Sequence, residues 1–148
     1  MCSSDLEPVI HNTVLVVVWT GNEIATGYNK TPKFRDYADF EKDLKNLAAV
    51  IRRYRHAIVI GPGSAEMWGI DKEHGAQKWE EKMCLAIRVF REAGVTILCP
   101  HEYINKLNKK DPWHFADTSE NRAMLAKMIH HVAVVGVSLR RKIGRAHV

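Results

Sequence analysis

The residues of this sequence best suited to chemistry are Asp111 and His114, within the stretch Asp111-Pro112-Trp113-His114-Phe115. A histidine acts as a general base when one ring nitrogen is free and a neighbouring acceptor fixes the other. A spacing of three residues within a turn can bring the carboxylate and the imidazole to the same side of that turn. The alternative is an ordinary turn before a helix, in which the histidine has no chemical role.

A second candidate group follows the first apolar run, at Thr20-Gly21-Asn22-Glu23. A tight glycine turn here would present the Asn22 amide at one edge of a sheet. A neutral N–H donor near a general base is what a developing oxyanion needs. The alternative is an ordinary Gly-Asn turn.

Apolar runs alternate with amphipathic stripes, and together they predict the scaffold that must position these residues. The predicted strands are 14–19, 56–61 and 95–99, and the predicted helices are 36–55, 77–93 and a last one that begins near 117. The run 14–19 does not alternate with polar residues, which is typical of a strand covered on both faces in a parallel sheet. Both candidate groups then follow strand ends, where open α/β folds bind ligands.

The ends of the last two helices have recognisable signals. Gly94 stands where a left-handed residue ends a helix, and Asp117 with Glu120 suggests a capping box for the last helix. The apolar residues that this last helix should bury are Met124, Leu125, Met128, Ile129 and Val132.

Strands that alternate with helices form βαβ units with right-handed crossovers. We expect a parallel sheet of three adjacent strands, with two helices on one face and the last helix on the other. This α/β arrangement is incomplete, because a doubly wound sheet has further strands, which would precede residue 7. The first strand should therefore lie at an open apolar edge.

The two ends of the chain match one another at the level of DNA. Residues 143–148 can be encoded by a string whose reverse complement encodes Met1 to Asp5, with GTG as the start codon. Both ends therefore resemble an inverted adaptor of the kind ligated to sequencing-library inserts. We expect residues 1–6 and 143–148 to be adaptor-derived, and residues 7–142 to be a partial domain that the insert cuts at both ends.

Composition limits the class of protein. A chain of 148 residues is the size of one domain, and its net charge is +5. The basic residues are spread over helices and loops, so a solvated surface explains the excess better than a nucleic-acid footprint does. Cys84 and Cys99 are expected to be core thiols in a reducing compartment. No window approaches 18 consecutive apolar residues, so no membrane span is expected.

The two candidate groups resemble motifs of the SGNH, or GDSL, hydrolases, over about residues 14–132. The third block of that family is a strand followed by G-x-N-D. Here it is Thr20-Gly21-Asn22-Glu23, in which Thr20 and Glu23 depart from the pattern. The fifth block, D-x-x-H before the last helix, is intact as Asp111-Pro112-Trp113-His114.

This resemblance implies a flavodoxin-like three-layer α/β/α fold and a serine hydrolase that acts on a small-molecule ester, without a metal or other cofactor. It implies that His114 is the general base, Asp111 its orienting partner and Asn22 an oxyanion donor. Gly21 belongs to the oxyanion turn. Because Trp113 lies between Asp111 and His114 in the sequence, we expect it to be a lid or pocket residue rather than a core residue.

The nucleophile is the main departure from the family. In the family the nucleophilic serine belongs to a strand before the Asn block. This chain has only residues 7–13 there, and they contain no serine. Ser3 and Ser4 lie in the adaptor-derived segment. Ser64 follows a strand but lacks the G-x-S-x-G pattern of a nucleophile elbow. In the family this loop shapes the substrate pocket, so the resemblance implies that Ser64 lies in the pocket wall. The chain alone is therefore expected to be inactive.

His101 and Glu102 match no metal-ligand spacing, so no metal site is expected. The alternative function is a non-catalytic α/β binding module, whose basic loops at 52–56 and 106–110 would bind an acidic partner or nucleic acid.

Overall fold

The computed structural model describes residues 13–19, 21–26, 32–99 and 117–146, and of residues 136–146 only the backbone. The elements in chain order are β1 (Val14–Val18), η1 (Gly21–Glu23), β2 (Ala25–Thr26), β3 (Lys33–Phe34), α2 (Tyr37–Ile51), β4 (His56–Ile60), η2 (Lys72–His74), α3 (Ala76–Glu92), β5 (Thr96–Leu98) and α4 (Ser119–Ala146). The predicted fold class, an incomplete α/β fold with a parallel sheet, is confirmed.

The main sheet has the strand order β1-β4-β5, and all of its strands are parallel. Val14 pairs with His56 and Val18 with Ile60, and β5 then pairs with the last three residues of β4. Within the described residues β1 is an edge strand, as predicted. The antiparallel pair β2-β3 lies between the first predicted strand and the first predicted helix, where the sequence indicated no strand.

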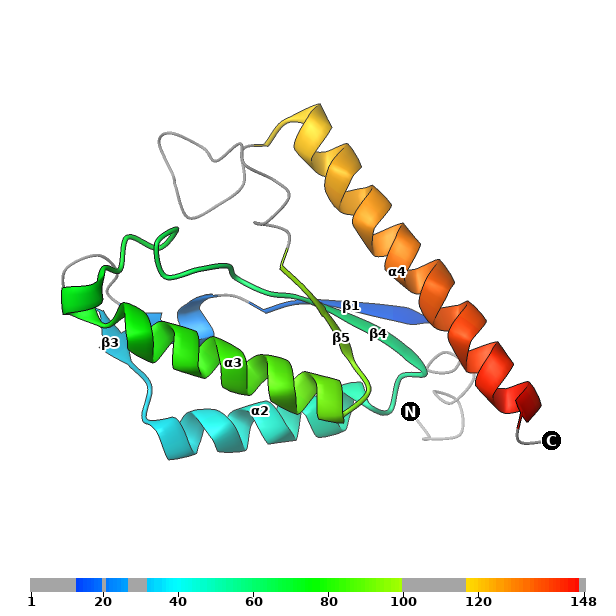
Figure 1. Ribbon diagram of the computed structural model, residues 1–148, viewed down its shortest axis with the longest axis horizontal. Helices are drawn as coiled ribbons and strands as arrows, with labels where there is room; N and C mark the ends of the chain where they lie inside the picture. The colour runs from blue at the N-terminus through cyan, green and yellow to red at the C-terminus, as the bar shows by residue number, and fades with distance from the viewer. Residues whose placement is uncertain (1–12, 20, 27–31, 100–116, 147–148) are drawn as a thin grey trace, which may run out of the picture.

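Helices cover both faces of this sheet. Figure 1 shows α2 and α3 side by side on one face and α4 crossing the other. Successive strand side chains point to opposite faces, and Ala57 and Val59 of β4 accordingly pack in the core with α2 and α3. Ile58 and Ile60 are also buried but face the α4 side. The central strand is thus the one that is covered on both faces.

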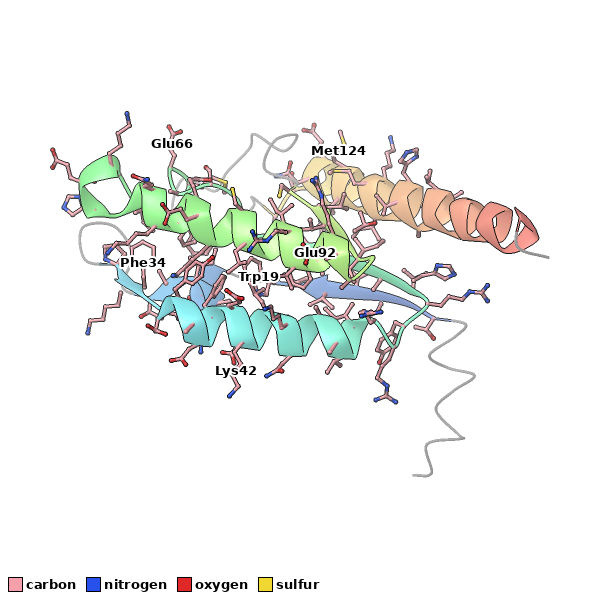
Figure 2. The ribbon with its side chains drawn as sticks, turned by 60° about the horizontal axis from the view of Figure 1, so that its bottom comes forward. Trp19, Phe34, Lys42, Glu66, Glu92 and Met124 are labelled. Carbon is pink, nitrogen blue, oxygen red and sulfur yellow. The ribbon has the colours of Figure 1, made fainter. Side chains whose placement is uncertain are left out.

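The core between α2, α3 and the sheet is built around Trp19, directly after β1. Its ring centroid lies 6.1 Å from that of Phe40 on α2 and 6.0 Å from that of Phe90 on α3. Figure 2 shows Trp19 enclosed between the two helices, while Lys42 points away from α2. The predicted apolar stripes of both helices therefore face this core.

The helix ends partly match the sequence signals. Gly94 has a φ of 74° and follows α3 as predicted. α2 begins after Asp36, whose side chain accepts a hydrogen bond from the Asp39 N–H. It ends at Ile51, four residues before the predicted end, because the chain tightens into a turn in which the Tyr54 N–H bonds the Ile51 carbonyl.

The signals at the start of α4 were misassigned. The Asn121 N–H donates to the Thr118 hydroxyl and the Arg122 N–H to the Thr118 carbonyl, so Thr118 is the N-cap. Asp117 instead forms an ion pair with Arg122. Of the residues that α4 was expected to bury, Met124 is 44% exposed and the others are half-buried.

Two further predictions about burial were wrong. The first strand is not covered on both faces, because Val14, Val16 and Val18 are exposed whereas Leu15 and Val17 pack toward the core. An edge strand lies at the margin of the covering helices, and its outer side has no neighbour among the described residues. Cys84 is exposed, because it lies on the solvent side of α3, whereas Cys99 is half-buried and packs against the core.

We predict that Val18→Lys reduces self-association without loss of stability, because Val18 is 70% exposed on an apolar edge strand. Its unfolding free energy in urea should stay within about 0.5 kcal/mol of the parent value, and light scattering at high concentration should fall. Val17→Lys is the matched control. It places a charge against the core and should cost about 2 kcal/mol or more. Equal effects of both variants on stability would contradict the assignment of the two faces.

Candidate functional site

Two loops meet at the carboxyl edge of the sheet. β1 runs into η1, which contains Gly21 and Asn22, and β4 runs into the loop Gly61–Ser64. Because β1 and β4 are parallel neighbours, their carboxyl ends lie at the same edge. Asn22 and Ser64 are exposed there, whereas Gly21 is buried. Asp111, Trp113 and His114 lie outside the described residues, as do His101 and Glu102.

Gly21 is enclosed by two tryptophan rings. A Cβ at this position would lie 2.6 Å from Cζ2 of Trp68 and 2.8 Å from Cη2 of Trp79, which is closer than a side chain can approach. The Ile24 N–H closes the turn by donating to the Gly21 carbonyl at 3.0 Å. The turn therefore has no room for a side chain at Gly21. The two rings confine the backbone that carries Asn22.

The loop after β4 is held by the same two rings. The indole N–H of Trp68 donates to the Pro62 carbonyl and that of Trp79 to the Gly63 carbonyl, both at 3.0 Å. The Ala65 N–H, two residues after Gly63, donates to Oε1 of Glu80 on α3. The hydrogen bonds of both tryptophans to this loop could not be predicted from the sequence.

A carboxylate and an imidazole that sequence reasoning missed do meet elsewhere, at Asp71 and His74. Oδ1 of Asp71 lies 2.5 Å from Nδ1 of His74 and also accepts the His74 N–H, so Asp71 caps η2. These hydrogen bonds hold the pKa of Asp71 below its usual value. His74 borders a surface pocket of about 610 Å³ that Phe34 and Lys78 also line. The signal that could have revealed it is the D-x-x-H spacing itself.

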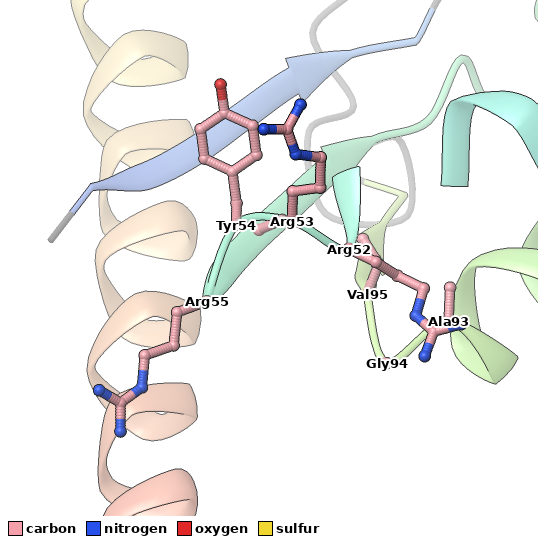
Figure 3. Close-up of a pocket in the computed structure, with 8 residues that line it drawn as sticks. Arg52, Arg53, Tyr54, Arg55, Ala93, Gly94 and Val95 are labelled. Atoms are coloured by element: carbon pink, nitrogen blue, oxygen red, sulfur yellow. The ribbon is translucent and has the colours of Figure 1, made fainter. Parts of the chain in front are cut away.

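At the opposite, amino end of the sheet, an arginine turn (Arg52–Arg55) joins α2 to β4. Its side chains and Val95 border a pocket of about 370 Å³ whose lining contains no carboxylate. Figure 3 shows the three guanidinium groups pointing in different directions. None of them forms an ion pair with a carboxylate of the described residues. The turn therefore presents three separate cations rather than one convergent site.

Lys82 is a buried cation that lies between α2 and α3. Its Nζ lies 5.2 Å from the ring centroid of Tyr37 and 5.4 Å from that of Phe40. Burial lowers the pKa of Lys82, and attraction to Asp36 acts in the opposite direction. The two rings supply cation–π attraction that offsets part of the lost hydration, which is a structural role.

In the part of the chain that the structure describes, no three side chains of His, Cys, Asp or Glu come together as a set that could hold a metal ion. No helix there combines the length and the apolar character needed to cross a membrane.

We predict that Gly21→Ala destabilises the protein by about 1–3 kcal/mol, because its methyl group would have to displace two buried rings. The unfolding free energy in urea measures this loss. Gly61→Ala is the matched control, at the carboxyl end of the neighbouring strand. Its Cβ would meet its nearest neighbour, the Leu98 carbonyl oxygen, at 3.4 Å. A loss for Gly21→Ala no larger than that of the control would show that the tryptophan rings do not confine this turn.

Compared with models of protein families, with curated proteins and with solved structures, the chain gives no match.

Proposed function

We propose that this chain is part of a serine ester hydrolase of the SGNH kind. In this proposal His114 is the general base, Asp111 orients its ring, and the Asn22 amide donates to the oxyanion. The observation that carries the proposal is the position of Asn22, which is exposed at the carboxyl end of β1 on a turn fixed by Trp68 and Trp79.

The connection between β5 and α4 gives independent support. The segment that contains Asp111 and His114 joins the carboxyl end of β5 to the start of α4. Figure 1 shows α4 running back from that side of the sheet toward the amino end. Both ends of the segment are thus on the side where Asn22 lies, as a shared site would require.

The proposed chemistry divides the roles among these groups. His114 accepts the proton of a serine hydroxyl as its oxygen attacks the ester carbonyl, and Asp111 stabilises the resulting imidazolium. The Asn22 N–H stabilises the negative charge that develops on the carbonyl oxygen. The imidazolium then returns the proton to the leaving alkoxide, and water releases the acyl group in a second, equivalent cycle.

The nucleophile is proposed to come from sequence encoded upstream of this chain. Ser64 is exposed after β4, in a loop whose preceding carbonyls are bound by indoles. We assign it to the pocket wall. By itself the chain should therefore show no esterase activity, since members of a catalytic triad act as a unit.

The test is hydrolysis of p-nitrophenyl acetate by the longer protein that includes the upstream residues. We expect His114→Ala to lower kcat by about 10³-fold or more. Asn22→Ala should lower kcat by about 10²-fold to 10³-fold. The matched control is His74→Ala, which removes the imidazole of the other D-x-x-H pair and should leave the rate unchanged.

Two outcomes would contradict the proposal. One is the absence of a G-D-S-like strand-to-helix turn within about 80 residues upstream, the length of two βα units with their connections. The other is full activity of the His114→Ala protein.

A second candidate function is favoured by the arginine turn. Three guanidinium groups without described carboxylate partners border a pocket free of acidic residues. They could bind an extended acidic partner such as a single-stranded oligonucleotide, with successive phosphates meeting successive cations.

We predict for this candidate that Arg53→Ala with Arg55→Ala weakens binding of a labelled oligonucleotide and makes it less dependent on salt. The slope of log K against log salt should become shallower by about 1.4, at about 0.7 for each lost contact with single-stranded phosphate. Fluorescence anisotropy at several salt concentrations measures both quantities. Arg88→Ala, an exposed arginine on α3, is the control. Equal weakening by the control would indicate a diffuse charge effect, and undetectable binding at low salt would remove this candidate.

A further inference from the structure

We propose that Trp68 and Trp79, the indole pair, are positioning residues that couple the turn after β1 to the loop after β4. The turn carries Asn22 and the loop carries Ser64. The purpose of this coupling rests on the proposed hydrolase function, because it would keep an oxyanion donor and a pocket residue in one fixed arrangement. The coupling itself is a property of the fold that can be measured on this chain.

The loop after β4 is fixed by both members of the pair. Pro62 and Gly63 are consecutive, and their carbonyls accept the two indole N–H groups at 3.0 Å each. Two consecutive peptide planes are thereby oriented toward the tryptophans. Because both residues are buried while Ser64 is exposed, the loop turns its carbonyls inward and its serine outward.

The turn after β1 is confined by the same pair. The space that a side chain of Gly21 would occupy is filled by Cζ2 of Trp68 and Cη2 of Trp79. The two rings pack against each other with centroids 5.6 Å apart. A displacement of either ring therefore changes the space beneath the turn and the hydrogen bonds of the loop together.

The pair is itself anchored from two elements. Trp79 belongs to α3 and is fully buried. Trp68 belongs to a turn in which its own N–H and that of Ile70 both donate to the Ala65 carbonyl. The Ala65 N–H in turn donates to Glu80, the residue after Trp79. The loop after β4, the turn at residues 65–70 and α3 are thus joined by hydrogen bonds.

Amide hydrogen exchange of the chain, followed by NMR, tests this coupling. Trp79→Phe keeps a ring but removes one indole donor, which leaves the Gly63 carbonyl without that bond. We expect exchange of the Ala65 and Ile24 N–H groups to quicken together by about tenfold, the factor that corresponds to about 1.4 kcal/mol. The side-chain amide signals of Asn22 should shift as well. Trp68→Phe, at a less completely buried position, should act in the same way and serves if Trp79→Phe does not fold.

The matched control is Phe90→Leu, which disturbs an equally buried ring on α3. It should quicken exchange of the Val95 N–H, which bonds the Phe90 carbonyl. Exchange of the Ala65 and Ile24 N–H groups should change no more than the loss of global stability requires. Faster exchange at Ala65 without a change at Ile24 or Asn22 would overturn the coupling, as would equal effects of the control. Esterase activity does not enter these measurements, so failure of the hydrolase proposal would be seen separately in the ester assay.

Discussion

The parallel pairing of β1 with β4 is the constraint on which the rest of this structure depends. Its register continues past the strands, because the Trp19 N–H donates to the Ile60 carbonyl at 2.9 Å. The two strands consequently end side by side, and Gly21 and Gly61 follow at the same edge. Without this register, Asn22 and Ser64 would have no common location, and two tryptophans could not contact both loops.

The helices cover the sheet unevenly. The central strand β4 is covered on both faces, and its isoleucines are buried. Toward β1, Val18 pairs with the buried Ile60 in the ladder and yet is largely exposed. Paired residues of one sheet thus differ in burial, because the helices cover the central strand and leave one face of β1 exposed. An apolar edge of this kind favours association with a further strand.

The sequence was sufficient to predict the order and type of the main elements, because apolar periodicity follows directly from strand and helix geometry. Periodicity does not reveal which neighbour covers a side chain. The valines of β1 were therefore expected to be buried, and Cys84 was expected in the core, although it lies on the outer side of α3. The end of α2 was placed too late because Tyr54 continues the apolar spacing, whereas local hydrogen bonds end the helix at Ile51.

The candidate site was predictable only in part, for a related reason. A Gly-Asn turn after a strand is visible in the sequence, but the rings that make Gly21 necessary come from residues 47 and 58 positions later. Contacts over such distances depend on tertiary packing, which a local pattern does not contain. The predicted positions of Asn22 and Ser64 at strand ends followed from topology alone, and their exposure at one edge agrees with it.

The two D-x-x-H stretches show that this spacing alone does not indicate a function. At Asp71 and His74 the spacing does bring a carboxylate to an imidazole, within a turn that precedes a helix. The lowered pKa of Asp71 means that its contribution to stability is present above the unfolded-state pKa and is lost as the pH falls through the folded-state pKa. This pair caps a turn, so carboxylate–imidazole contact alone does not make a catalytic site. In the proposed hydrolase, His114 would differ from His74 by lying beside an oxyanion donor and a nucleophile at the carboxyl edge. The exposure of Asn22 at that edge supports the proposal.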